Sequence, residues 1–165
     1  MSQKGNKMAG RITKSEQQLK PDPKYKDKVL SRFINCVMLD GKKSVAQRVI
    51  YDALDIIENR MKGKPAAIEV FHKAIDNVKP NVEVRSKRVG GTNYQVPMQV
   101  NKKRQQSLAF RWIIKSCRAD RGKPMSTRLA NELMNAYKGE GKAMNTRDQT
   151  HRMAEANKAF AHFAW

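Results

Sequence analysis

Cysteine is nearly absent from this chain, and its scarcity narrows the classes of protein to consider. The 165 residues include only two cysteines, Cys36 and Cys117, which lie far apart and show no Cys-x-x-Cys or Cys/His spacing. A disulfide framework and a zinc site are therefore disfavoured. We expect two reduced thiols, each buried on the apolar face of a helix.

Long apolar runs are missing too. The longest uninterrupted run in the expected helices covers residues 36–39, which is far too short to cross a bilayer. No lipidation motif opens or closes the chain, and the first residues lack the apolar stretch of a secretory signal. The sequence therefore predicts a cytoplasmic protein without a membrane partner.

Carboxylates are scarce relative to basic residues. The chain has 34 Lys and Arg residues against 15 Asp and Glu, which gives a formal net charge of +19. A positive field of this size attracts polyanions, and nucleic acid is the obvious candidate. Aromatic residues make up only 7% of the chain, so stacking platforms for unpaired bases are few. We expect a protein that recognises phosphates and folded RNA shape more than single-stranded sequence.

Signatures of catalysis are also lacking. His72, His151 and His162 show no metal-binding helix spacing, and the chain has neither a Gly-x-Ser-x-Gly elbow nor a phosphate-binding Gly-rich loop. The carboxylates fall at spacings typical of helix-surface ion pairs, for example Glu132 four residues after Arg128. The sequence therefore predicts no enzyme, no cofactor, no metal and no small-molecule substrate.

The length of the chain indicates one folded domain. Residues 1–20 are rich in Lys and Arg and show almost no apolar periodicity, which is typical of a flexible basic tail that orders on an anionic partner. Residues 21–165 are predicted to form a single helical RNA-binding domain. Its apolar residues recur at helical spacing in six segments, approximately 29–38, 45–61, 66–78, 108–119, 127–137 and 147–163.

Several residues predict where the helices begin and which faces they bury. Ser44 with Gln47, and Thr146 with Gln149, have the spacing of capping boxes, Ser126 suits an N-cap, and Pro65 suits a first helical turn. In the second helix the expected buried stripe consists of Val45, Val49, Ala53, Ile57 and Met61.

A β-hairpin is predicted between the third and fourth helices, at residues 82–100. Residues alternate along both halves, and Gly90-Gly91 supplies the turn. Pro97 cannot donate to a ladder, which favours a two-stranded ribbon over the middle of a larger sheet. An isolated ribbon is marginally stable, so its root should pack on the helices. The predicted fold is thus mainly α, a six-helix bundle-like domain with a protruding two-stranded β-hairpin.

The basic residues are grouped along the chain. Arg111, Lys115 and Arg118 are about one and two turns apart on the fourth helix, so this helix and the foot of the hairpin are predicted to form one phosphate-binding surface. At the tip, Tyr94 is the aromatic residue expected to stack on an unpaired base, with Asn93 and Gln95 beside it. The full set of predicted RNA-binding residues is Lys42, Lys43, Arg85, Lys87, Arg88, Lys102, Lys103, Arg104, Arg111, Lys115 and Arg118.

Five segments, 33–44, 77–80, 82–97, 129–134 and 150–162, resemble in order the most characteristic segments of the bacterial-type small ribosomal subunit protein seven family. This resemblance covers about residues 20–165. It implies primary binding to the 3′ major domain of 16S-type rRNA, nucleation of the subunit head, and ribosomal proteins nine and eleven as neighbours. It favours a cytoplasmic ribosome over a chloroplast one.

The resemblance also assigns roles to residues. It implies that Lys42, Lys43, Arg85, Lys87, Arg88, Lys102, Lys103, Arg104 and Arg111 face rRNA. It implies that the hairpin tip, which consists of Gly90, Gly91, Thr92, Asn93 and Tyr94, faces the exit-site tRNA and the mRNA path.

Two other classes remain open at this stage. A histone-like architectural DNA-binding protein also combines helices with a basic, Pro-containing ribbon, although such proteins are much shorter obligate dimers. An RNA-modifying enzyme would need a catalytic constellation that the residues do not show.

Overall fold

The computed structural model describes residues 19–163. The basic tail predicted over residues 1–20 therefore lies outside the described residues, except for Leu19 and Lys20.

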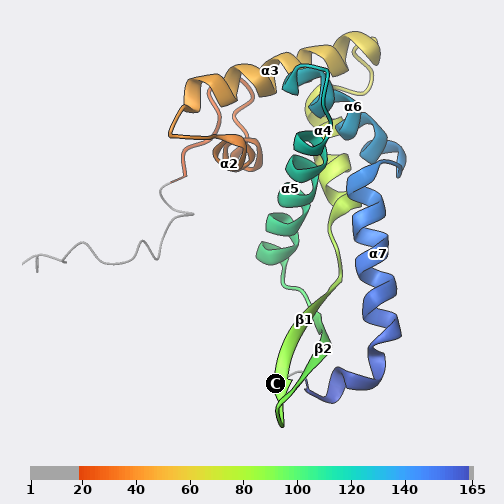
Figure 1. Cartoon of the computed structure of the whole chain (residues 1–165). Coiled ribbons are helices and arrows are strands. Elements are labelled where there is room, and N and C mark those ends of the chain that lie inside the picture. Colours follow the sequence, from red (N-terminus) through yellow and green to blue (C-terminus); the bar gives the residue numbers. More distant parts are fainter. Residues whose placement is uncertain (1–18, 164–165) are drawn as a thin grey trace, which may run out of the picture.

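Six α-helices, one 3-10 helix and one two-stranded sheet make up residues 19–163, as the sequence predicted for a mainly α fold (Figure 1). In chain order they are α2 (Lys28–Val37), α3 (Lys43–Arg60), α4 (Ala67–Val78), β1 (Val82–Val89), β2 (Thr92–Gln99), α5 (Lys102–Ala119), α6 (Met125–Lys138), α7 (Lys142–Ala156) and η1 (Lys158–Phe163).

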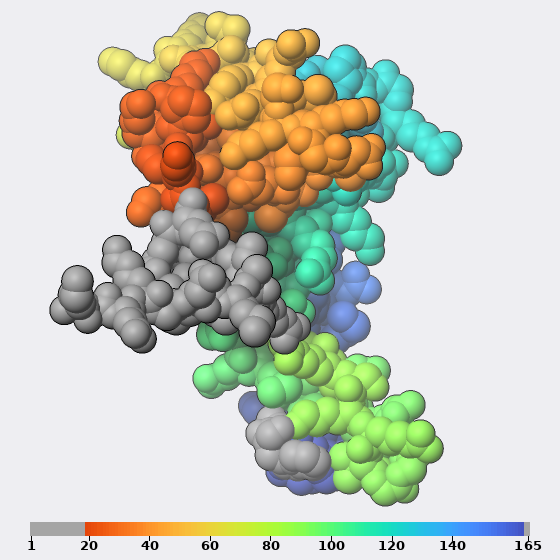
Figure 2. Space-filling view, turned by 90° about the vertical axis from the view of Figure 1, so that its left-hand side faces the viewer, coloured from red at the N-terminus to blue at the C-terminus, as the bar shows by residue number. Residues whose placement is uncertain are grey.

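The molecule is elongated. Figure 1 shows α2 and α3 at one end and the ribbon at the other, with α5 and α7 running lengthwise toward the ribbon. In Figure 2 the helical body is a broad mass and the ribbon, in green, is a narrower projection at its foot. The fold therefore separates a helical end from an arm.

The core lies where α6 meets α3, α4 and α5. Leu129, Ala130, Leu133 and Ala136 of α6 are buried there, at the three- and four-residue spacing that places side chains on one helix face. This confirms the apolar period that predicted the helix. Helix α6 therefore contacts α3, α4, α5 and α7.

The buried stripe of α3 differs from the predicted one. Ala46, Ile50 and Leu54 are buried along with Ala53 and Ile57. The prediction was wrong for Val45 and Val49, because the face of α3 that meets α6 is rotated away from them. Val45 and Val49 lie instead beside the α2–α3 turn.

Two of the helices are capped by neighbouring side chains, but not by the predicted ones. Asp27 accepts a hydrogen bond from the Leu30 amide of α2 at 2.6 Å, and Asn101 accepts one from the Arg104 amide of α5 at 2.9 Å. These caps satisfy amides that have no partner inside the helix.

The predicted caps at Ser44, Ser126 and Thr146 are wrong. Ser44 and Ser126 lie inside the first turns of α3 and α6, and Pro65 precedes the Ala66 N-cap of α4 instead of lying in its first turn. Thr146 lies inside α7, where its hydroxyl donates to the Lys142 carbonyl at 2.9 Å.

A distant residue caps α7. Glu132 of α6 is buried, with 7% exposed, and its carboxylate accepts a hydrogen bond from the Ala143 amide at 2.7 Å. The predicted pair of Glu132 with Arg128 is therefore wrong, because the carboxylate turns toward the start of α7. This charge-assisted bond ties α6 to α7.

The last predicted helix is divided in two. α7 ends at Ala156, where the Asn157 side chain donates to the Met153 carbonyl at 2.8 Å, and the chain continues as η1. Phe160 and Phe163 therefore turn toward the ribbon instead of extending the stripe of α7, and Met153 is exposed.

Replacing Glu132 by Ala should lower the free energy of unfolding by about 1–3 kcal/mol, because it leaves a buried amide at the start of α7 without its partner. Urea unfolding measures this change. The control is Glu140→Ala, an exposed carboxylate in the adjoining loop, which should change stability by less than about 0.5 kcal/mol. Equal effects of the two variants would contradict the capping role of Glu132.

Candidate nucleic-acid interface

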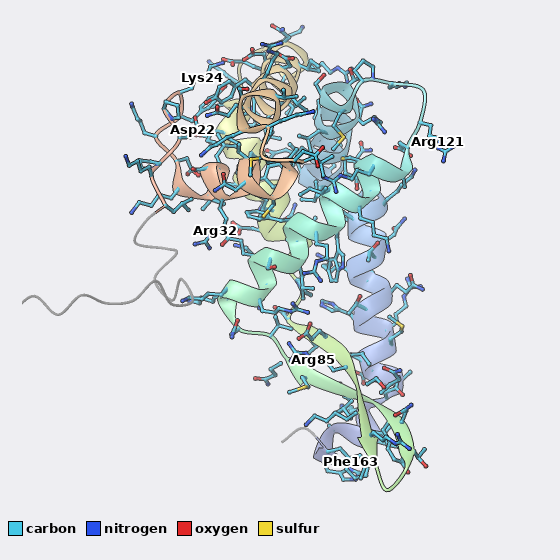
Figure 3. All side chains as sticks on the ribbon, turned by 60° about the vertical axis from the view of Figure 1, so that its left-hand side comes forward. Asp22, Lys24, Arg32, Arg85, Arg121 and Phe163 are labelled. Atoms are coloured by element: carbon cyan, nitrogen blue, oxygen red, sulfur yellow. The ribbon has the colours of Figure 1, made fainter. Side chains whose placement is uncertain are left out.

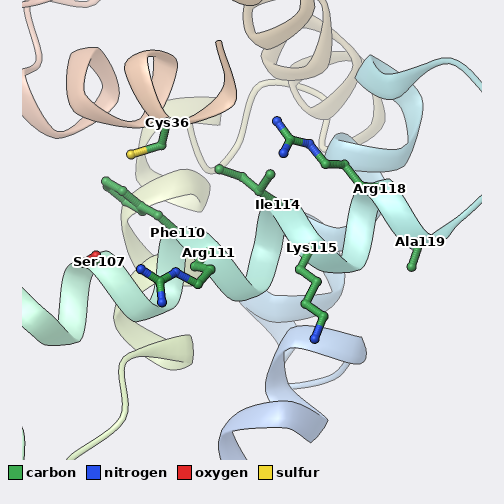
Figure 4. Close-up of a pocket in the computed structure, with 8 residues that line it drawn as sticks. All are labelled: Cys36, Ser107, Phe110, Arg111, Ile114, Lys115, Arg118 and Ala119. Atoms are coloured by element: carbon green, nitrogen blue, oxygen red, sulfur yellow. The ribbon is translucent and has the colours of Figure 1, made fainter. Parts of the chain in front are cut away.

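Basic side chains of α5 surround a groove between α5 and α2. The groove has a volume of about 640 Å³. Figure 4 shows Arg111, Lys115 and Arg118 projecting from α5, with Cys36 on α2 across from Phe110. We call it the α5 groove, and it is lined by Cys36, Ser107, Phe110, Arg111, Ile114, Lys115, Arg118 and Ala119.

The α5 groove combines an apolar floor with an accessible basic rim. Phe110 and Ile114 are buried, whereas Arg111, Lys115 and Arg118 are exposed. The three bases lie at the spacing that sequence analysis predicted, on the side of α5 opposite its core residues Ile113 and Cys117. Such a rim can neutralise several phosphates at once.

A second groove adjoins the first at Arg118 and has a volume of about 470 Å³. It lies beside the turn that joins α2 to α3, so we call it the turn groove. Lys42 lies on this groove with Arg118, although the two residues are far apart in sequence, and Lys43 is exposed as the first residue of α3. Its lining residues are Val37, Leu39, Asp40, Lys42, Val45, Ala46, Val49, Arg118, Met125 and Arg128.

Arg118 is held at the junction of the two grooves. Its guanidinium donates to the Val37 carbonyl, the last residue of α2, at 3.3 Å. A cation at the C-terminal end of a helix interacts favourably with the helix dipole. Lys42, Arg111, Lys115 and Arg118 therefore form one basic surface that runs along α5 and reaches the α2–α3 turn.

Two arginines at this end were missed by the sequence analysis. Arg32 lies one turn before Cys36 on α2 and donates to the Gln106 side chain at 2.8 Å. Arg128 of α6 donates to the carbonyls of Cys117, at 2.9 Å, and Asp120 at the end of α5. Arg32 and Cys36 are four residues apart and so share one helix face, which could have indicated that Arg32 lies near the groove. No residue close to Arg128 in the sequence indicated the contacts of Arg128.

At the foot of the arm, a buried carboxylate holds two of the predicted rRNA-binding residues. Glu83 of β1 has only 7% of its surface exposed. Arg85 donates to one of its oxygens at 2.6 Å, and Arg104 of α5 donates to the other at 3.1 Å. The charges of Arg85 and Arg104 therefore serve first to compensate Glu83 and to tie the ribbon to α5.

Lys102 and Lys103 are placed differently from Arg104. Both are exposed in the first turn of α5, which contains no acidic residue. Cations at the N-terminal end of a helix oppose the dipole, which costs about 0.3–1 kcal/mol each. The helix dipole therefore does not explain Lys102 at this end, whereas a nearby polyanion would.

The two faces of the ribbon have different surroundings. The register pairs Lys87 with Tyr94 and Arg88 with Asn93, so Lys87 and Arg88 lie on opposite faces. Val96 is fully buried on the Lys87 face, whereas Arg88 and Asn93 are exposed on the other. Arg85 and Lys87 thus share one face of the ribbon, and Arg88 lies on the other.

Tyr94 packs against η1. Its ring centroid lies 5.2 Å from that of Phe160 and 5.1 Å from that of Phe163. On the neighbouring strand, Lys87 donates to the Phe163 carbonyl at 3.1 Å. Figure 3 shows Phe163 beside the ribbon. The ring that the sequence suggested for base stacking therefore has aromatic partners within the chain, and the exposed part of the tip is Gly90, Gly91, Thr92 and Asn93.

The two cysteines differ in exposure. Burial raises the pKa of Cys117 to about 12. Cys36 is exposed on the α5 groove, so its predicted burial is wrong, because the groove opens between α2 and α5 at this position. Partial desolvation still raises the pKa of the Cys36 thiol, and the nearby Arg32 and Arg111 guanidiniums oppose that rise.

Within residues 19–163, no helix is long and apolar enough to span a membrane. The same residues contain no group of three or more His, Cys, Asp or Glu side chains that could hold a metal ion.

The fold and its surface define a mainly α-helical, strongly basic domain with a protruding β-ribbon. The family profile described as ribosomal protein S7p/S5e matches residues 9–158. The chain therefore belongs to this family, which confirms the resemblance found in its motifs.

Relatives from several bacteria are similar over nearly their whole length. The small ribosomal subunit protein uS7 of Rhodopirellula baltica is 60% identical, and the match covers 94% of this chain and 99% of that protein. The protein of the same name from Salinibacter ruber is 57% identical, with 87% and 90% covered. That of Thermotoga neapolitana is 52% identical, with 90% and 94% covered.

Replacing Tyr94 by Ala should release the ribbon from η1, because the ring loses its contacts with Phe160 and Phe163. Amides of β1 and β2 should then exchange faster with deuterium, while those of α3, α4 and α6 should not change. Tyr94→Phe is the matched control, since it keeps the ring. Unchanged exchange in the Tyr94→Ala ribbon would show that the packing on η1 does not hold the arm.

Proposed function

We propose that this protein is a structural constituent of the small ribosomal subunit that binds 16S-type rRNA directly. The observation that carries the proposal is the convergence of Lys42, Arg111, Lys115 and Arg118 on two adjoining grooves. Membership of the S7p/S5e family supports it, since the relatives are small-subunit proteins by name. As a primary binder of the 3′ major domain, the protein nucleates assembly of the subunit head in the cytoplasmic ribosome.

The grooves and the helix start are proposed as the main rRNA contact. Lys102 and Lys103 extend the basic surface of α5 toward the arm, and Lys42 and Lys43 extend it across the α2–α3 turn. Phosphate contacts of this kind fix the register and orientation of a protein on folded RNA. Arg85 and Arg104 have a positioning role in this scheme, because Glu83 binds both of them.

The arm is proposed to reach beyond the primary site, toward the exit-site tRNA and the mRNA path. Arg88 and Asn93 are exposed on its outer face, and Tyr94 holds its direction through η1. Ribosomal proteins nine and eleven are the proposed protein neighbours.

The proposed role of the arm predicts that subunits carrying Tyr94→Ala form a head but retain deacylated tRNA less well. Normal tRNA retention by these subunits would contradict that role.

The charge distribution disfavours an architectural DNA-binding role. In that class the ribbon supplies the cations that meet DNA. Here Arg85 is paired with Glu83, and Lys87 donates to the Phe163 carbonyl, so the accessible cations concentrate on the helices. No catalytic role is proposed, because the exposed side chains that converge on the grooves are cations suited to phosphate binding.

The affinity for a 3′ major domain fragment of 16S rRNA should fall steeply with salt. A log–log slope of about 4 or more is expected if roughly six phosphates are neutralised, since each contributes about 0.7 on single strands. The double variant Lys102→Ala, Lys103→Ala should reduce the slope by about 1–2 while the protein stays folded under the binding conditions. Filter binding and urea unfolding measure these two quantities.

The control is the double variant Lys62→Ala, Lys64→Ala, which removes two exposed lysines from the α3–α4 loop, outside both grooves. It should leave the slope close to that of the wild type. A slope near zero for the wild-type protein would contradict phosphate binding. If the control variant lost more of the slope than the α5 variant, the phosphate-binding surface would lie elsewhere on the protein.

A further inference from the structure

Two unusually exposed apolar side chains lie on the turn groove. Among residues 19–163, the exposed large hydrophobic residues are Leu39, Val45 and Met153, with 61%, 54% and 45% of their surface exposed. Leu39 and Val45 both line the turn groove. Apolar surface that is concentrated in one open hollow indicates a binding site more strongly than scattered apolar residues do.

The turn between α2 and α3 fixes this apolar surface next to a cation. Asp40 and Gly41 both have positive φ, at 50° and 71°, and the Lys42 amide donates to the Leu39 carbonyl at 2.9 Å. Gly suits this backbone, and Asp tolerates it. Leu39 and Lys42 are therefore the first and last residues of one tight β-turn, which holds these two residues close to each other.

The charges at the turn groove are mainly positive. Lys42, Arg118 and Arg128 line it with a single carboxylate, Asp40. Arg118 is anchored on the Val37 carbonyl, and Arg128 on carbonyls of α5. The Nε atom of Arg128 is buried without a hydrogen-bond partner. The groove thus offers an apolar wall between fixed cations, which complements an apolar ligand that carries negative charge on its flanks.

We propose that the turn groove binds a single unpaired nucleotide of rRNA. Its base lies on Leu39, Val45 and the side of Val49, and its flanking phosphates meet Lys42 and Arg118. This inference rests on the proposed rRNA binding and deepens it. The volume of about 470 Å³ lies within the range of about 300–1,000 Å³ that small-ligand sites occupy.

A nucleotide fits the groove better than an apolar peptide segment does. A peptide side chain would cover Leu39 and Val45 but would leave the cations without anionic partners. A nucleotide supplies a flat, largely apolar base and a phosphate on each side, so it matches both parts of the groove. Because paired bases are stacked inside a helix, this contact would also distinguish folded rRNA with an extruded base from a uniform duplex.

The first test is the double variant Leu39→Ser, Val45→Ser, which changes two exposed side chains and should leave the fold intact by circular dichroism. Its affinity for a 3′ major domain fragment of 16S rRNA should fall about tenfold, because the base loses the apolar surface on which it is buried. The log–log salt slope should not change, since no phosphate contact is removed. Met153→Ser is the matched control and should bind like the wild type.

The second test locates the nucleotide. Unpaired positions of the fragment are replaced one at a time by an abasic residue. One position should weaken wild-type binding about tenfold but have little further effect on the Leu39→Ser, Val45→Ser protein, because the two changes remove the same contact. Full additivity at every position would overturn the proposal.

The remaining outcomes separate this inference from the proposed function. If the double variant binds the isolated fragment normally and fails only when other small-subunit proteins are added, the groove receives a protein side chain and the inference is wrong. If the wild-type protein itself shows no salt-dependent binding to the fragment, the proposed function fails instead. A loss of salt slope in the Leu39→Ser, Val45→Ser protein would also overturn the apolar contact.

Discussion

Contact among three buried phenyl rings fixes where the basic surface lies. The Phe33 ring of α2 is 5.4 Å from the ring of Phe71 in α4 and 5.1 Å from that of Phe110 in α5. These aromatic contacts hold α2 against the core beside α5, so the α5 groove has two walls and the α2–α3 turn meets Arg118. Apolar packing in the core thus determines where the basic surface lies.

The division of the basic residues follows from this arrangement. At the helical end, the cations remain accessible around grooves. At the foot of the arm, Glu83 holds Arg85 and Arg104, and at the tip η1 holds Tyr94 and Lys87. Some of the positive charge therefore stabilises the shape of the molecule, and the rest is available to RNA. We infer that these contacts fix the direction of the arm, so that no partner is needed to order it.

Local patterns in the sequence predicted the elements well, because helix and strand periods depend on residues a few positions apart. The ribbon was predicted from alternation, Gly90-Gly91 and Pro97, and the motifs identified the family. What could not be predicted depends on distant contacts. Glu132 caps α7 across a loop, Tyr94 meets Phe163 at the far end of the chain, and Lys42 lies on one groove with Arg118. None of these pairs has a sequence spacing that reveals it.

The native cysteines allow the most direct measurement of the central claim, that rRNA covers the α5 groove. Cys36 lies exposed on that groove, whereas Cys117 is buried with a pKa of about 12 and serves as an internal control. Alkylation at mildly alkaline pH is followed by mass spectrometry with and without a saturating 3′ major domain fragment. We expect the fragment to slow alkylation of Cys36 strongly, a DNA duplex of equal length to protect it far less, and Cys117 to stay unmodified throughout. An unchanged rate at Cys36 in the rRNA complex would contradict the account.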